Sequence, residues 1–104
     1  MDEKCVNYNQ MEWEDAIAYP AGSQRKVLRK KTSPITMLLK MPPGFHMDVH
    51  CHTTTEQHFV LEGQYTSEGK TCGPGSYRLV PAGATHGPFI SEKGAVVLVV
   101  YDPR

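Results

Sequence analysis

The chain has 104 residues, enough for one hydrophobic core but not for two, so we expect a single domain. Eleven Lys and Arg balance eleven Asp and Glu, and a chain without net charge has no long-range field to attract a nucleic acid. No apolar run is long enough for a membrane span, and three cysteines, an odd number without a CxxC pair, fit a reducing compartment. We therefore expect neither nucleic acid nor membrane as a partner, and a cytoplasmic protein.

Residues 1–22 are expected to form an extension, either one short helical turn or a clamp across the rest of the chain. Beyond it, over residues 23–104, short apolar segments alternate with Pro and Gly at the spacing of a sandwich or barrel. The predicted strands are Lys26–Arg29, Ile35–Met41, His46–His52, Glu56–Glu62, Gly75–Val80, Thr85–Pro88 and Val96–Tyr101. No segment of the barrel region keeps a helical period, so the sequence predicts an all-β fold.

The five histidines cluster in the middle of the chain. His50 and His52 are two apart on a predicted strand, so both imidazoles point to one face, with Cα atoms roughly 6.7 Å apart. Two imidazoles at that separation can converge on one ion. Residues 53–55 have the length of a hairpin loop, which would place Glu56 across from His52. His86 begins a later strand and could supply a third imidazole.

Two gapped motifs around these residues resemble the cupin superfamily. The first consists of Gly44, His50, His52, Glu56 and Gly63, and the second of Gly75, Pro81, Gly83 and His86. The Asn that usually ends the second motif is replaced by Ile90. Several segments also resemble the small cupins of zinc-binding anti-sigma factors and of diketone-cleaving dioxygenases. The resemblance implies a double-stranded β-helix, or jelly roll, with a metal ion near one mouth of the barrel.

The resemblance also implies a ligand set for one divalent ion, Fe, Mn, Zn or Ni: His50, His52, Glu56 and His86. His58 shares the inward parity of Glu56 and is either a further polar group in the pocket or a rival fourth ligand. We expect Glu56 to be the ligand because its place in the motif is specific. Glu56 and His58 are also the candidate catalytic residues, since either could move a proton when it is not bound to metal. The competing interpretation is an ordinary sandwich with polar residues on its solvent face, which leaves their shared spacing to coincidence.

Other residue groups have plainer interpretations. The basic cluster between residues 25 and 31 could bind an anion, but a charged edge strand explains it equally well. Cys51 is expected to point outward as a small packed side chain. Five apolar residues could shape a substrate cavity, although packing between two sheets is their ordinary role: Phe45, Met47, Phe59, Tyr77 and Phe89.

Three imidazoles and one carboxylate leave coordination positions open on a metal ion. This predicts a metal-dependent enzyme of the dioxygenase type that acts on a small organic molecule able to chelate the ion. The alternative is a metal- or ligand-sensing module without turnover, and a purely structural metal site is a third interpretation. We also expect a homodimer, because the segment 96–100 is apolar on both faces.

Overall fold

The structure is a computed structural model that describes residues 3–30, 34–48, 50, 51 and 54–101, with the backbone alone for residues 50, 51 and 86. One 3₁₀ turn and twelve strands make up this part of the chain. In order, they are η1 (Tyr8–Gln10), β1 (Glu14–Asp15), β2 (Gln24–Arg29), β3 (Ile35–Met41), β4 (Phe45–Met47), β5 (His50–Cys51), β6 (Glu56–Gly63), β7 (Tyr65–Ser67), β8 (Lys70–Cys72), β9 (Tyr77–Val80), β10 (Thr85–His86), β11 (Phe89–Ser91) and β12 (Ala95–Tyr101).

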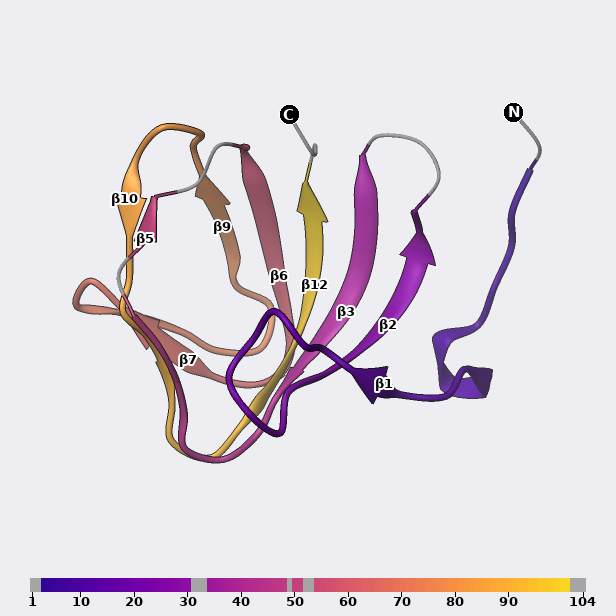
Figure 1. The fold of residues 1–104 in the computed structure, drawn as a ribbon, viewed down its shortest axis with the longest axis horizontal. Coiled ribbons are helices and arrows are strands. Elements are labelled where there is room, and N and C mark those ends of the chain that lie inside the picture. Colours follow the sequence, from indigo (N-terminus) through magenta and orange to yellow (C-terminus); the bar gives the residue numbers. More distant parts are fainter. Residues whose placement is uncertain (1–2, 31–33, 49, 52–53, 102–104) are drawn as a thin grey trace.

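The strands form two main antiparallel sheets that enclose the core (Figure 1). A six-stranded sheet has the order β1-β2-β3-β12-β6-β9, and a four-stranded sheet has the order β4-β11-β7-β8. A separate pair, β10-β5, lies at the upper left of Figure 1. The described chain is thus a jelly-roll barrel, and the all-β prediction is confirmed.

The core is built by alternation along the central strands of the larger sheet. In β12, Val97 and Val99 point inward and are 0% and 2% exposed. Val97 lies opposite Leu39 of β3, and Val99 lies opposite Met37, so side chains on one face of the pleat pack together. Phe45, Tyr65 and Phe89 close the core from the smaller sheet.

Two local predictions are wrong. The segment His46–His52 is not one strand: β4 pairs with β11 in the four-stranded sheet, whereas β5 pairs with β10. Residues 53–55 also do not close a hairpin, because β6 pairs with β12 and β9 in the part of the chain that the structure describes. Strands β5 and β6 thus belong to different sheets, and a short loop between two strands does not by itself make them a hairpin.

An additional hairpin, β7–β8, lies where no strand is predicted from the sequence. Its two-residue loop consists of Glu68 and Gly69, both with positive φ (53° and 77°). This is the backbone of a tight primed turn, which matches the twist of the flanking strands. The hairpin brings Tyr65 into the core, where it is 1% exposed.

The N-terminal segment docks on the outer face of β2 and β3. The Lys26 ammonium donates a hydrogen bond to the Tyr8 carbonyl oxygen (2.7 Å) and lies 4.5 Å from the centre of the Trp13 ring. The Lys40 ammonium lies 5.4 Å from the same ring. Lys26 is only 6% exposed, so it is not part of a solvated edge. The described part of the segment thus holds one 3₁₀ turn, and Trp13 lies over the ammonium groups of two neighbouring strands.

Among the described residues, no helix is long and apolar enough to cross a membrane.

Candidate functional site

Strand β6 directs alternate side chains into the barrel. Glu56 and His58 point inward, with side chains 12% and 8% exposed, and Val60 follows them at 2%. His58 lies opposite Val99 of β12 on one side and Arg78 of β9 on the other. Because ladders flank β6 on both sides, the two polar side chains have a fixed direction. The inward parity predicted for this pair agrees with the structure.

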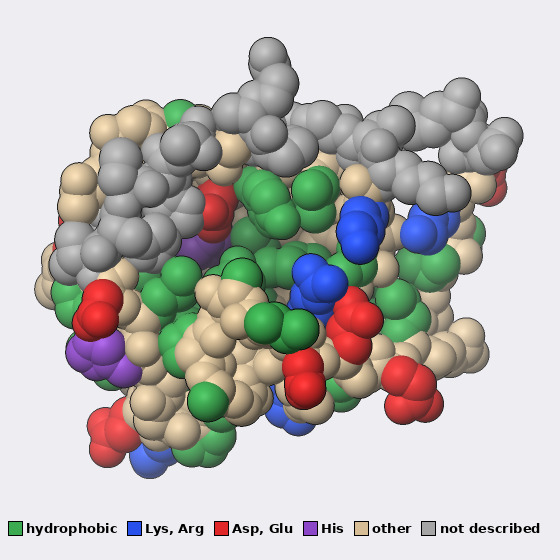
Figure 2. All heavy atoms as spheres, in the orientation of Figure 1, with side chains coloured by type: hydrophobic (Ala, Val, Ile, Leu, Met, Phe, Trp, Pro, Cys, Tyr) green, Lys and Arg blue, Asp and Glu red, His purple; other side chains and the backbone are tan. Residues whose placement is uncertain are grey.

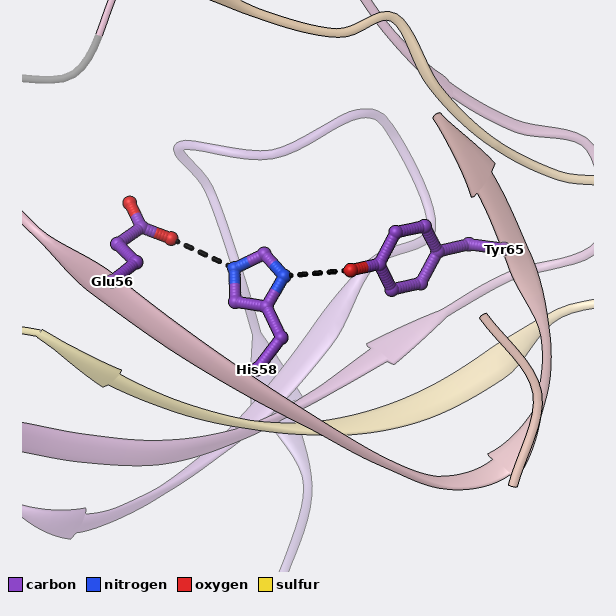
Figure 3. Close-up of polar contacts among 3 residues, drawn as sticks. All are labelled: Glu56, His58 and Tyr65. Atoms are coloured by element: carbon purple, nitrogen blue, oxygen red, sulfur yellow. Dashed lines mark hydrogen bonds and ion pairs between the residues drawn. The ribbon is translucent and has the colours of Figure 1, made fainter. Parts of the chain in front are cut away.

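His58 bonds through both of its ring nitrogens (Figure 3). Its Nε2 lies 3.0 Å from Oε1 of Glu56, and its Nδ1 lies 2.9 Å from the phenol oxygen of Tyr65. Burial, and after it the Cys72 thiol, raises the pKa of Tyr65 to about 12, although Arg78 acts in the opposite direction. Tyr65 therefore keeps its proton, and the neutral tautomer of His58 that satisfies both contacts accepts from the Tyr65 hydroxyl at Nδ1 and donates from Nε2–H to the Glu56 carboxylate.

A cavity of about 30 Å³ lies beside this chain of hydrogen bonds, between the two sheets. Its walls are Tyr19, Leu39, Met41, Phe45, Met47, Glu56, His58, Phe89, Val97 and Val99. The volume holds about one water molecule. Figure 2 shows hydrophobic side chains gathered in a hollow near the centre of the face in view. The described walls are thus apolar apart from one phenol, one carboxylate and one imidazole.

The five apolar residues considered as cavity walls divide into two groups. Phe45, Met47 and Phe89 line the cavity, and Phe45 and Phe89 also belong to the core. Phe59 and Tyr77 lie outside, 40% and 51% exposed, with ring centres 4.9 Å apart.

The predicted histidine ligands fall at the edge of what the structure describes. His50 begins β5, His86 ends β10, and their backbones are register partners across the two strands. Their side chains, and the whole of His52, lie outside the described residues. His46 is exposed and hydrogen-bonds Asp48 (3.0 Å) rather than lining the cavity.

The donor set fits a divalent metal ion. Glu56 supplies a carboxylate held at the cavity wall, and two of the three candidate histidines are paired through their backbones. Imidazole and carboxylate are ligands that Fe, Mn, Zn and Ni all accept. The described side chains contain no group of three His, Cys, Asp or Glu placed to bind an ion. The imidazoles of residues 50, 52 and 86 are not among these described side chains.

Two polar residues of the site were not predicted from the sequence. Tyr65 lies in the unpredicted hairpin, and Tyr19 comes from the loop between β1 and β2. Burial, and then the Glu56 carboxylate, raises the pKa of Tyr19 above its usual range. A signal for Tyr65 was available, because a Gly that follows the polar run Thr66–Glu68 is a turn signature.

Comparison with solved structures finds the same fold at low sequence identity. KdgF from Halomonas sp. superposes with a TM-score of 0.81 at 21% identity, over 99% of this chain and 96% of that one. An acetylacetone dioxygenase from Acinetobacter johnsonii gives 0.83 at 20% identity, over 98% and 75%. A chain of the Rhodobacter sphaeroides complex of SigE with the anti-sigma ChrR gives 0.76 at 21% identity, over 92% of this chain and about half of that one (52%).

No curated protein matches the sequence. The model of one protein family, described as the ChrR Cupin-like domain, matches residues 1–103. This match covers nearly the whole chain and agrees with the barrel, the two motifs and the resemblance to small cupins. The chain belongs to the ChrR Cupin-like domain family.

Proposed function

We propose that this cupin is a metal-dependent enzyme, dioxygenase-like, that acts on a small organic substrate able to chelate the ion. One divalent ion, Fe, Mn, Zn or Ni, would be held by His50, His52, Glu56 and His86. The observation that carries the proposal is the Glu56 carboxylate, fixed by His58 at the wall of an otherwise largely apolar cavity. A divalent ion at this place would supply Lewis acidity, and iron would add redox chemistry.

His58 is proposed to support the ligand set rather than to join it. Both of its ring nitrogens are engaged, Nε2 by Glu56 and Nδ1 by Tyr65. Such outer contacts orient a ligating carboxylate and keep it ionised. The same contact supports the proposed catalytic role of the pair: a Glu56 carboxylate that is released from the ion could take a proton from a substrate, while His58 keeps that carboxylate in place.

The wall chemistry supports a substrate with an apolar body. The described walls carry the Glu56 carboxylate and no Lys or Arg. An anionic group of the ligand that lies against these walls would therefore be repelled. A neutral molecule with two oxygen atoms placed to chelate one ion fits this environment better than a polyanion. The fold likeness to an acetylacetone dioxygenase is consistent with such a molecule.

Metal content tests the proposal directly. Protein purified without added metal should carry about one divalent ion per chain, measured by plasma mass spectrometry. His50→Ala, His86→Ala and Glu56→Ala should lose the ion, and His58→Ala should bind it about 10 to 100 times more weakly. His46→Ala is the matched control, because His46 is exposed and bonded to Asp48, and it should keep the ion. Wild-type protein that binds no divalent ion, even after reconstitution, would overturn the proposal.

A second candidate is a metal- or ligand-sensing module without turnover. The small cavity favours it, since about 30 Å³ leaves little room for a substrate beside an ion. The family and the likeness to a chain of the SigE–ChrR complex agree with it. Oxygen uptake with acetylacetone and catechol separates the two: iron with uptake supports the enzyme, and tightly held zinc without uptake supports the module.

The proposal extends to the setting of the protein. A homodimer is proposed to form through the exposed apolar face of β6 and β9, and a different protein partner on this face belongs to the second candidate. A cytoplasmic location is proposed because Cys5 and Cys72 are both free thiols, as expected in a reducing compartment.

A further inference from the structure

One wall of the cavity differs in origin from all the others. Nine of the ten described lining residues belong to strands β3, β4, β6, β11 and β12, whereas Tyr19 belongs to the loop between β1 and β2. A strand residue keeps its position through the hydrogen-bonded ladder or ladders of its strand. The loop lies outside both cupin motifs, so its side chain can differ between barrels that share the metal site.

The loop holds Tyr19 firmly because it is anchored at both ends. Ala16 is 4% exposed and its N–H donates to the Ser23 carbonyl (2.9 Å), next to the β1–β2 ladder. Two successive turns lie between these ends: Tyr19 N–H donates to the Ala16 carbonyl (3.0 Å), and Ser23 N–H donates to the Pro20 carbonyl (3.1 Å). Ile17 is 93% exposed on the same loop. The turns thus send Tyr19 inward and Ile17 outward.

Tyr19 packs against the core and faces the polar end of the cavity. Its ring contacts the core cluster and lines the same cavity as Glu56, whose carboxylate, after burial, raises the pKa of the Tyr19 phenol. None of the described residues forms a hydrogen bond with its hydroxyl group, so that donor is available to a ligand that lies against Glu56. A ring in this position also limits the space. The cavity has a volume of about 30 Å³, whereas ordinary ligand pockets have volumes of about 300 Å³ or more.

We propose that Tyr19 determines the size of the organic ligand that this cavity accepts, and that its hydroxyl donates a hydrogen bond to an oxygen atom of that ligand. The ligand class is a small neutral molecule with an apolar body and a paired-oxygen group, such as a 1,3-diketone. This assignment rests on the proposed function for the ligand's place beside Glu56. The role of the ring as a wall rests on the structure alone.

The first experiment uses metal-free protein and p-cresol, which has the shape of the removed side chain. Tyr19→Ala should bind p-cresol at least about tenfold more tightly than wild type, because the ring leaves an apolar space of its own size. Ligand-observed NMR and the dependence of Tm on p-cresol concentration measure the binding. Ile17→Ala, in the same loop but facing solvent, should behave as wild type. Equal binding by all three proteins overturns the proposal, and Tyr19→Leu provides the same test if Tyr19→Ala does not fold.

The second experiment uses zinc-loaded protein, which binds without turnover, and calorimetry with pentane-2,4-dione and heptane-3,5-dione. Wild type should prefer the smaller diketone, Tyr19→Ala should lose the preference, and Tyr19→Phe should keep it while binding both about fivefold more weakly. An unchanged preference in Tyr19→Ala overturns the proposal. Zinc-loaded wild type that binds neither diketone refutes the substrate class of the proposed function, and the p-cresol result still decides whether Tyr19 is the limiting wall.

Discussion

The two faces of strand β6 carry opposite chemistry. On the inside, Glu56 and His58 form a buried polar chain with Tyr65. On the outside, Phe59 and Leu61 are 40% and 38% exposed. In an isolated barrel the usual arrangement is the reverse, with polar residues outside and apolar residues inside. This distribution of polar and apolar side chains is what the proposed site inside the barrel and the proposed association through the outer face would require.

Neighbouring strand β9 extends the outer face. Tyr77 and Leu79 are 51% and 53% exposed, and the Tyr77 hydroxyl donates to Gln57 (2.9 Å), which holds the Tyr77 ring against the sheet. Across the same sheet, Leu38 of β3 also points outward but is 1% exposed, close to Lys26 under the N-terminal segment. One half of the outer face is therefore covered by the N-terminal segment, whereas on the other half the described residues leave Tyr77 and Leu79 exposed.

The largest expected effect comes from breaking the inner face. His58→Ala should lower the free energy of unfolding by about 3 kcal/mol. The substitution removes the hydrogen bonds from His58 to the Glu56 carboxylate and to the Tyr65 hydroxyl, and it opens a cavity. Urea unfolding measures the change. Gln57→Ala, the neighbouring residue on the outer face, should change stability by less than about 0.5 kcal/mol. A loss in His58→Ala no larger than that of Gln57→Ala would contradict the importance of the inner chain.

Alkaline pH tests the hydrogen-bonded group of Glu56, His58 and Tyr65 without removing any of its side chains. Folding raises the pKa of Tyr65 from 10.0 to about 12, so between these values the unfolded chain loses this proton while the folded chain keeps it. The unfolded state then binds fewer protons, and stability falls by about 2 kcal/mol as the pH rises from 10 to 12. Tyr65→Phe should remove this part of the pH dependence, measured by urea unfolding at several pH values. Tyr77→Phe should leave it in place, and a Tyr65→Phe profile identical to that of wild type would show that Tyr65 does not titrate as described.

A substitution on the outer face should have the smallest effect on stability and a large effect on dimerisation. Leu79→Glu should weaken the proposed homodimer about 30-fold or more, because it places a charge in an apolar contact, while leaving the Tm nearly unchanged when measured on the monomer. Sedimentation velocity across micromolar concentrations measures the dimer. Ile90→Glu, at an exposed apolar position on the smaller sheet, is the control and should still dimerise. Wild-type protein that stays monomeric at micromolar concentration contradicts the dimer.

Where the sequence pattern is strong, the prediction of the fold is accurate. The strand Ile35–Met41 has the predicted bounds, and β6 and β12 differ from their predicted ranges by one residue at one end, because each of these strands alternates or is apolar over at least seven residues. The hairpin predicted at residues 53–55 is wrong because loop length alone does not say which layer the next strand joins. Lys26 is buried although Lys in a basic cluster is normally solvated, because Trp13 and Tyr8 cover it.

The site divides in the same way. Parity along β6 predicts that Glu56 and His58 share a face, since a two-residue period is a local property. Tyr65 and Tyr19 come from a short hairpin and an irregular loop, and contacts over such sequence separations have no local period to reveal them. The ligand roles of His50, His52 and His86 stay predictions, as does the boundary between residues 1–22 and the barrel.

Trp13 has a practical consequence, because it is the only tryptophan in the sequence. Its indole lies against two ammonium groups of the outer face, and Lys40 points away from the cavity that its neighbours Leu39 and Met41 line. Indole emission therefore serves as an optical reporter of whether the first fifteen residues are docked, read separately from events inside the barrel. A stopped-flow experiment could follow release of this segment in real time without any attached dye.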